Sequence, residues 1–116
     1  MPSGRTLVGD ARRRAARRAH ALLNEAFLEP MSADDLAAAA GCGRFVLYRA
    51  FREESGLAPS DYQCLLRLRR ARRLLTRGTS PADAAASAGF ADQAHLNRWF
   101  KRAYGVTPAT YQRAAH

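Results

Sequence analysis

Two short segments of the chain carry side chains that are suited to reading DNA bases. An arginine can donate two hydrogen bonds to guanine, and a glutamine or asparagine can bond adenine in the same way. Both segments also present the exposed face of a short helix, and an α-helix fits the major groove. The candidates for base contact are Arg44, Phe45, Tyr48 and Arg49 in the first segment and Gln93, Ala94, Asn97 and Arg98 in the second.

Each of these candidates also has a plainer interpretation. Arg49 and Arg98 could be ordinary surface arginines or partners in salt bridges within the protein, and Phe45 and Tyr48 could be packing residues. The glutamine and asparagine of the second segment would be unremarkable exposed side chains if they stood alone. Their position in the second copy of a repeated unit is what favours base contact.

Other residues near these segments are suited to the sugar–phosphate backbone, which cationic and hydroxyl groups bind without reading the sequence. The candidates for phosphate contact are Ser32, Arg52, Ser80, Lys101 and Arg102. Lys and Arg number 19 against 10 acidic residues, so the net charge is +9. Such a field attracts polyanions. We expect double-stranded DNA as the partner, ahead of an anionic membrane surface or a merely solvated basic surface.

Membrane insertion and catalysis are not expected. No apolar run approaches the roughly 20 residues of a membrane span, and the N-terminus lacks the apolar core of a secretory signal. Cys42 and Cys64 form no close pair, and His20, His95 and His116 share no recurring spacing. There is no nucleophile–base pair and no glycine-rich phosphate loop. We therefore expect no enzyme activity, no cofactor and no metal, with both thiols reduced in a cytoplasm.

Both base-reading segments belong to an internal repeat. Six residues recur at an offset of 49: Leu47, Arg49, Phe51, Gly56, Pro59 and Tyr62 match Leu96, Arg98, Phe100, Gly105, Pro108 and Tyr111. Upstream, an offset of 48 relates Ser32, Asp35, Ala37, Ala40 and Gly41 to Ser80, Asp83, Ala85, Ala88 and Gly89. A unit of about thirty residues that appears twice predicts two similar structural units.

Apolar residues at helical spacing position these segments on helices. The expected helices cover residues 10–28, 33–40, 44–55, 61–77, 82–88, 93–104 and a last short stretch from 108. Asp10, Ser32, Ser80 and Asp92 are the expected N-caps, and glycines end the helices. The outer face of the first helix carries Arg12, Arg13, Arg14, Arg17 and Arg18. The absence of isoleucine favours helix over strand.

Helix, glycine-containing turn and helix in succession form the helix-turn-helix signature. We therefore expect an all-α fold of about seven helices, with two helix-turn-helix subdomains joined by a long central helix. The expected division is a flexible lead over residues 1–9, a first subdomain over 10–59, a linker helix over 60–78 and a second subdomain over 79–116. Leu47 and Phe51 would then face one core, and their repeat partners the other.

A known family shares these motifs. The matching residues in the first copy and the central helix are Leu36, Ala37, Gly41, Leu47, Arg49, Phe51, Gly56, Pro59, Tyr62, Arg67, Leu68, Ala71, Leu74 and Leu75. Those in the second copy are Ala85, Gly89, Phe90, Asp92, Gln93, Leu96, Arg98, Phe100, Lys101, Gly105, Val106, Thr107, Pro108 and Tyr111. On these residues, which span roughly 15 to 113, the chain resembles the DNA-binding domain of AraC/XylS-type transcriptional regulators. The resemblance implies that two recognition helices enter consecutive major grooves on one face of DNA and that the eight base-contact candidates read bases.

Two positions depart from the family pattern. Gly43 stands where the family usually has a serine as helix cap, so the first recognition helix is capped more weakly, by a few tenths of a kcal/mol. Ala94 stands where a serine is frequent, which removes one polar contact. Both departures affect the base preference and leave the fold unchanged.

Family members usually carry this module at the C-terminus of a longer bacterial regulator, and a few stand alone; the sequence fits either case. We expect a monomeric module in the cytoplasm, associated with the nucleoid, with any dimerisation through a domain outside this chain. The alternative is an interaction module, in which one helix-turn-helix reads DNA and the first helix or the aromatic face contacts RNA polymerase or a partner domain.

Overall fold

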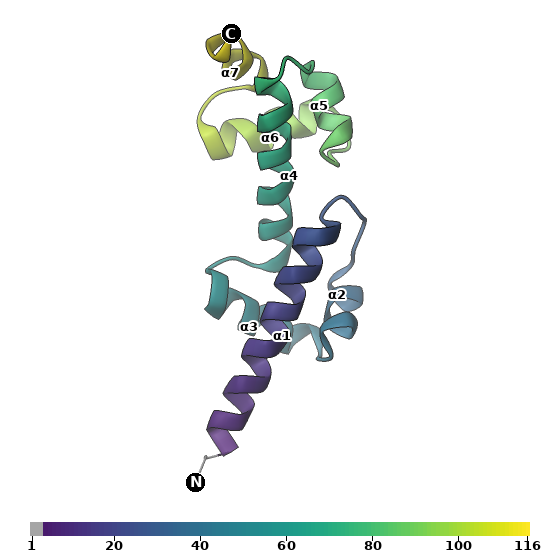
Figure 1. Ribbon diagram of the computed structural model, residues 1–116, viewed down its shortest axis with the longest axis vertical. Coiled ribbons are helices and arrows are strands. Elements are labelled where there is room, and N and C mark those ends of the chain that lie inside the picture. Colours follow the sequence, from purple (N-terminus) through teal and green to yellow (C-terminus); the bar gives the residue numbers. More distant parts are fainter. Residues whose placement is uncertain (1–3) are drawn as a thin grey trace. The chain divides into compact units, whose positions relative to one another are not determined.

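The structure is a computed structural model that describes the backbone of residues 4–116 and the side chains from Gly9 onward. Its helices are α1 (Gly4–Ala26), α2 (Ala33–Ala40), α3 (Arg44–Ser55), α4 (Pro59–Thr76), α5 (Pro81–Ser87), α6 (Gln93–Tyr104) and α7 (Pro108–Ala115), as Figure 1 shows. The described residues form seven helices and no strand, which confirms the predicted all-α class. The chain divides into two compact units. Unit 1 ends at Gln63, and unit 2 runs from Cys64 to His116.

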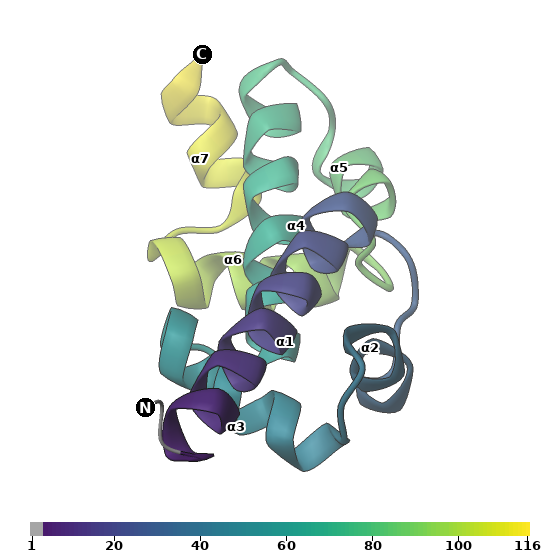
Figure 2. The ribbon, with the colours of Figure 1, turned by 60° about the horizontal axis from the view of Figure 1, so that its bottom comes forward.

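Unit 1 is built on α1, which packs against both α2 and α3 (Figure 2). Small residues such as Ala16 and Ala19 are buried on α1, and they allow the other two helices to approach closely. Leu23 of α1, Leu47 of α3 and Phe51 of α3 are almost completely buried. Burying a side chain of this size contributes roughly 1.5–3 kcal/mol. The core therefore fixes which face of α3 points inward.

Unit 2 repeats this arrangement on the larger part of α4, with α5, α6 and α7 beside it in Figure 1. Its core cluster consists of Leu68, Ala71, Leu75, Ala84, Ala85, Ala88, Phe90, Leu96 and Phe100. Phe100 meets Tyr104 and Tyr111 edge to face, at ring-centroid distances of 4.6 and 5.5 Å. The pair with Tyr111 packs α6 against α7, in a geometry that aromatic pairs favour.

Equivalent residues of the two repeats bind the C-terminal ends of α1 and α4. Gln63 Nε2 donates to two backbone carbonyls just beyond α1, at 3.1 Å each. Gln112 Nε2 does the same at the end of α4, at 3.0 and 2.6 Å. The preceding Tyr62 and Tyr111 each hydrogen-bond a side chain in the last turns of the same helices, at 3.0 Å. The glutamines therefore tie the segment at or just beyond the C-terminal end of each supporting helix to a distant part of the chain.

The ends of α1, α4 and α5 differ from the prediction, most of all at the start of α1. The first helix begins at Gly4 instead of Asp10, so residues 4–9 are helical; residues 1–3 of the expected flexible lead lie outside the described residues. Asp10 pairs with Arg13 inside the helix and does not cap it. A glycine inside a helix costs only about 1 kcal/mol, which the helix tolerates at Gly9. The boundary between the two compact units falls inside α4, between Gln63 and Cys64.

Candidate nucleic-acid interface

The first helix of each helix-turn-helix begins at a capping serine. The Asp35 amide donates to Ser32 Oγ at 3.0 Å, and the Asp83 amide donates to Ser80 Oγ at 3.2 Å. Both serines are exposed. A serine hydroxyl that accepts such a bond still has its own proton to donate. The two phosphate-contact candidates are therefore caps whose O–H is available to a phosphate oxygen.

Helix α3 presents a basic and aromatic face on the side away from the core. Its exposed residues include the five candidates Arg44, Phe45, Tyr48, Arg49 and Arg52. Phe45 is 73% exposed and Tyr48 is 45% exposed, so neither is a core packing residue. Tyr48 Oη accepts a hydrogen bond from Arg52 Nη1 at 3.3 Å. This bond ties an aromatic base-contact candidate to a phosphate-contact candidate one helical turn away.

The arginine candidates differ in whether a carboxylate lies near them. Arg44 lies 3.8 Å from the Asp34 carboxylate, and both side chains are mostly exposed. An exposed pair of this kind contributes little stability, about 0–1 kcal/mol, and leaves Arg44 easy to redirect. Among the described residues, no carboxylate lies within ion-pair distance of Arg49 or Arg98. The described residues therefore give no support to the salt-bridge interpretation of these two arginines, and base contact and an ordinary surface role both stay open.

Helix α6 presents the corresponding face in unit 2. Leu96 and Phe100 face the core, while Gln93, Ala94 and Arg98 are exposed and Asn97 is half-buried. Unlike α3, which starts at Gly43 without a side-chain cap, α6 is capped through a 2.7 Å bond from the His95 amide to the Asp92 carboxylate.

Two cations stand in the last turn of α6. Arg102 lies over the Trp99 ring at 5.5 Å, and Lys101 is exposed beside it. Cations in this place stabilise the helix C-terminus as well as offering phosphate contacts. Arg102 is therefore partly pre-oriented by its aromatic neighbour.

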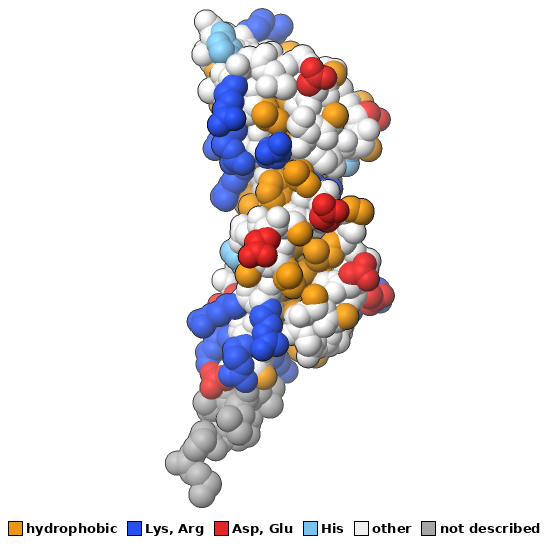
Figure 3. All heavy atoms as spheres, turned by 45° about the vertical axis from the view of Figure 1, so that its right-hand side comes forward, with side chains coloured by type: hydrophobic (Ala, Val, Ile, Leu, Met, Phe, Trp, Pro, Cys, Tyr) orange, Lys and Arg blue, Asp and Glu red, His pale blue; other side chains and the backbone are white. Residues whose placement is uncertain are grey.

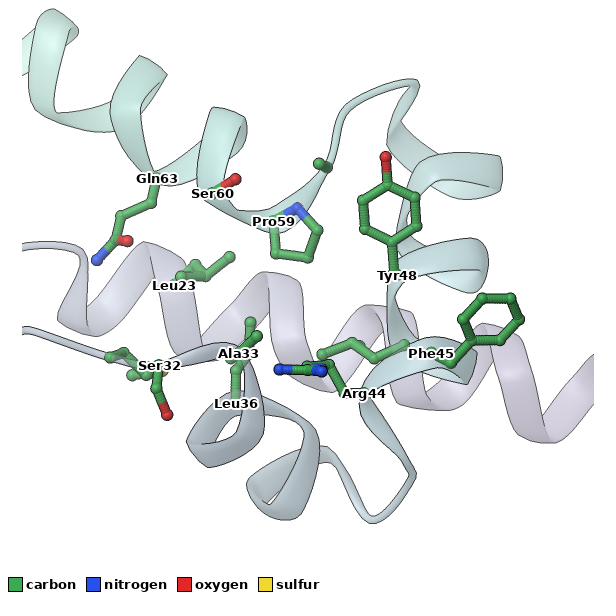
Figure 4. A pocket seen from close by; sticks show the side chains of 13 residues that line it. Leu23, Ser32, Ala33, Leu36, Arg44, Phe45, Tyr48, Pro59, Ser60 and Gln63 are labelled. Carbon is green, nitrogen blue, oxygen red and sulfur yellow. The ribbon is translucent and has the colours of Figure 1, made fainter.

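A pocket of about 350 Å³ borders α3 in unit 1. Its walls come from α1, α2, α3 and the first turn of α4, and Figure 4 shows Leu23, Leu36 and Pro59 around it. Phe45 and Tyr48 belong both to the pocket and to the exposed face of α3, and the Phe45 ring points away from Leu23 and Leu36 (Figure 4). The pocket is thus part of the same surface as the base-contact candidates.

The remaining titratable residues form no second site in the described part of the chain. His95 packs beside the turn: its Nδ1 accepts from the Ala91 amide at 3.2 Å, and its ring meets Phe90 edge-on at 5.3 Å. Cys42 and Cys64 are half-buried thiols. The described residues contain no group of three or more His, Cys, Asp or Glu that could hold a metal. None of the described helices is both long and apolar enough to cross a membrane.

The chain is similar to known helix-turn-helix proteins over most of its length. The profile of a family described as "Helix-turn-helix domain" matches residues 36–114. An AraC-type transcriptional regulator from Chromobacterium violaceum is 30% identical, with a TM-score of 0.79 over 87% of this chain and 91% of that one. The DNA-binding domain of AdpA, a global transcriptional factor solved with a target DNA, is 31% identical, with a TM-score of 0.77 over the same shares.

Curated relatives extend this likeness. The uncharacterised HTH-type transcriptional regulator YbfI of Bacillus subtilis is 36% identical over 74 residues, which are 64% of this chain and 27% of that protein. The HTH-type transcriptional regulator MtrA of Neisseria gonorrhoeae is 35% identical over 81 residues, or 69% of this chain and 27% of that protein. The chain spans 27% of the length of each of these two relatives.

Proposed function

Because the chain belongs to the helix-turn-helix family as an AraC-type DNA-binding domain, we propose that it is a transcriptional regulator that binds double-stranded DNA with sequence specificity. The observation that carries the proposal is the structural repeat. Helices α3 and α6 bury equivalent core residues and expose equivalent faces that carry the base-contact candidates. The solved complex of AdpA with a target DNA supports duplex DNA as the ligand.

In the proposed complex, α3 and α6 enter consecutive major grooves. Arg49 and Arg98, which occupy the same place in the two copies, bond guanine, and Gln93 and Asn97 bond adenine. Arg52, Lys101 and Arg102 neutralise phosphates and fix the register, together with the capping serines. Two base clusters about one helical turn apart, roughly 34 Å, follow from groove geometry.

The DNA site is directional in this proposal. Residues shared by the two copies are mostly core and turn residues, whereas the exposed positions differ. Phe45 and Tyr48 on α3 stand where α6 has Ala94 and Asn97. Two unlike reading faces in one chain match two unlike half-sites, in contrast to the palindrome that a symmetric dimer reads. The module acts as a monomer in the bacterial cytoplasm, on the nucleoid, and uses neither cofactor nor catalysis.

The proposal is tested by selecting bound duplexes from a random library. The affinity of Arg98→Ala is then measured on the selected site and on random DNA. Loss of a bidentate guanine contact should weaken the selected site by about 1–3 kcal/mol more than random DNA. Arg113→Ala on α7 removes the same charge outside both reading faces and serves as the control. An equal loss on both DNAs would make Arg98 a phosphate contact, and a library without any preferred sequence would refute specific binding.

A second candidate function draws on the apolar exposure of α3. Phe45, Val46 and Tyr48 are among the exposed large hydrophobic residues of the described chain, and all three lie on this helix. Such a surface also fits a protein partner, RNA polymerase or another domain, with only α6 reading DNA. In that case Arg44→Ala and Arg49→Ala would leave DNA affinity unchanged and abolish transcription activation. Loss of DNA affinity in these variants would exclude this second function for α3.

A further inference from the structure

Three of the outer arginines of α1 line a groove in unit 1. Arg12, Arg14 and Arg18 form one wall of an opening of about 420 Å³ in unit 1. The other wall is the helix-turn-helix turn at Gly41 and Cys42, and the groove reaches Val46 on α3. Figure 3 shows blue side chains gathered beside the grey N-terminal residues, where α1 lies.

These arginines differ from their neighbour on the same helix. The hydrogen bond with Asp10, the Asp10 charge and the Glu54 charge raise the pKa of Arg13, which stays charged and is paired with a carboxylate on its own helix. Within the described residues, Arg14 and Arg18 have no carboxylate at ion-pair distance, and no described residue that lines the groove is acidic. The groove therefore has a basic lining, with no acidic side chain among the described residues that form it.

The groove borders the exposed face of α3 along one edge. Arg18 Nη1 lies only 3.5 Å from the place that a Cβ on Gly41 would occupy, so its guanidinium lies against the turn that precedes α3. Val46, at the end of the groove, follows Phe45 directly and is 40% exposed. A helix in the major groove is flanked by the two sugar–phosphate backbones, and the groove is only about 12 Å wide. Cations along one edge of such a helix are placed to meet a phosphate run.

We propose that Arg14 and Arg18 form an accessory binding surface for the DNA sugar–phosphate backbone beside the first recognition helix, with Arg12 adding to its field. The inference rests on the proposed function and extends its footprint from α3 and α6 to α1. The chemistry matches phosphate better than lipid, because α1 contributes only alanine and arginine side chains to the groove and nothing that would insert among acyl chains. Its contribution is independent of base sequence, since phosphates carry none.

The salt dependence of DNA binding tests this surface. The log–log slope of affinity against salt changes by about 0.9 for each phosphate neutralised. Arg14→Gln/Arg18→Gln should therefore reduce the slope by about 2, so that a fourfold rise in salt costs the wild type roughly tenfold more affinity than the variant. This difference should appear equally on the selected site and on random duplex of the same length.

A matched control separates local contact from net charge. Arg13→Gln/Arg17→Gln removes the same two charges from α1 but changes an internally paired residue and one that does not line the groove. Its slope should stay near that of the wild type. Arg14→Lys/Arg18→Lys should retain the slope, and far-ultraviolet circular dichroism checks that each variant is folded. Single methylphosphonate substitutions should then weaken the wild type at particular phosphates where the Gln variant is insensitive.

Equal slopes for the two Gln variants, whether both fall or both stay, would overturn the proposal. If the wild type still preferred its selected site in that experiment, the proposed function would stand without the α1 surface. If slopes differed but no site was preferred, the surface would stand and specific recognition would fail. The proposal would also be overturned if Arg14→Gln/Arg18→Gln kept the wild-type salt slope for DNA but lost activation in a reconstituted transcription assay. That result would assign the groove to an acidic protein partner.

Discussion

Replacing Gly43 with Ser should stabilise unit 1, whereas the same replacement two residues earlier, at Gly41, should destabilise it. Gly43 is the N-cap of α3, with φ −77° and ψ 157°, which any residue adopts, and no side chain caps the helix. A Cβ there would meet nothing within 4 Å. Gly41 has φ +79°, in the left-handed region, where a side chain is strained.

The magnitudes follow from these two backbones. At Gly43 a serine hydroxyl gains a few tenths of a kcal/mol as a cap, and the unfolded chain loses freedom worth about 0.4–1 kcal/mol. Unit 1 should gain about 1 kcal/mol. At Gly41 the left-handed conformation costs about 1–2 kcal/mol, which the same entropy term offsets only in part. Contact with Arg18 at 3.5 Å adds no clash. We expect a net loss of up to roughly 1.5 kcal/mol.

Urea unfolding followed by far-ultraviolet circular dichroism measures both changes. The fluorescence of Trp99, the single tryptophan, reports unit 2 and identifies the part of the transition that belongs to unit 1. In thermal unfolding, each 1 kcal/mol of stability corresponds to a shift of about 4–8 °C in the Tm of a domain this small. If both variants moved in the same direction, the assignment of Gly43 as an uncapped but unstrained position would be refuted.

Substitutions at three further positions probe the helix ends. Asp92→Ala should destabilise unit 2 by about 0.5–2 kcal/mol because α6 loses its cap, and Asp92→Asn should retain most of that stability; urea unfolding by Trp99 fluorescence would contradict this if both fell alike. Gln63→Ala and Gln112→Ala should each cost about 0.5–1.5 kcal/mol, since each removes side-chain hydrogen bonds to backbone carbonyls at partly exposed positions. Hydrogen exchange should show the loss at the end of α1 for the first variant and of α4 for the second, and uniform exchange changes in both units would refute local capping.

The sequence predicts the helix-turn-helix helices closely. The expected ranges 33–40 and 44–55 coincide with α2 and α3, and Asp92 caps α6 as expected. The inward positions Leu47, Phe51, Leu96 and Phe100 are all buried. These features depend on capping bonds and helical periodicity, which act within about four residues and can be read along the chain.

The start of α1 is predicted poorly because only weak local preferences act there. Glycine and the absence of an apolar stripe suggest a loop over residues 1–9, whereas the helix runs from Gly4. Intrinsic preferences of about 1 kcal/mol per residue are weak against the continuation of an existing helix. The surroundings of the base-contact candidates are likewise only half visible in the sequence. The helical wheel predicts that Arg98 points outward, but the lack of an ion-pair partner among the described residues needs the packed structure.

The sequence alone determined the repeated helix-turn-helix unit, the N-caps of its helices and the inward faces of α3 and α6, because each depends on local spacing. Only the tertiary structure decided which distant residues complete them. Gln63 and Gln112 repeat at the offset of 49 along with their tyrosines, yet their spacing does not reveal that each ends a helix more than thirty residues upstream. In the same way, α1 showed five arginines on one outer face, but only packing places Arg14 and Arg18 beside the turn that precedes α3. Such contacts arise when buried faces bring elements together, and no local rule records them.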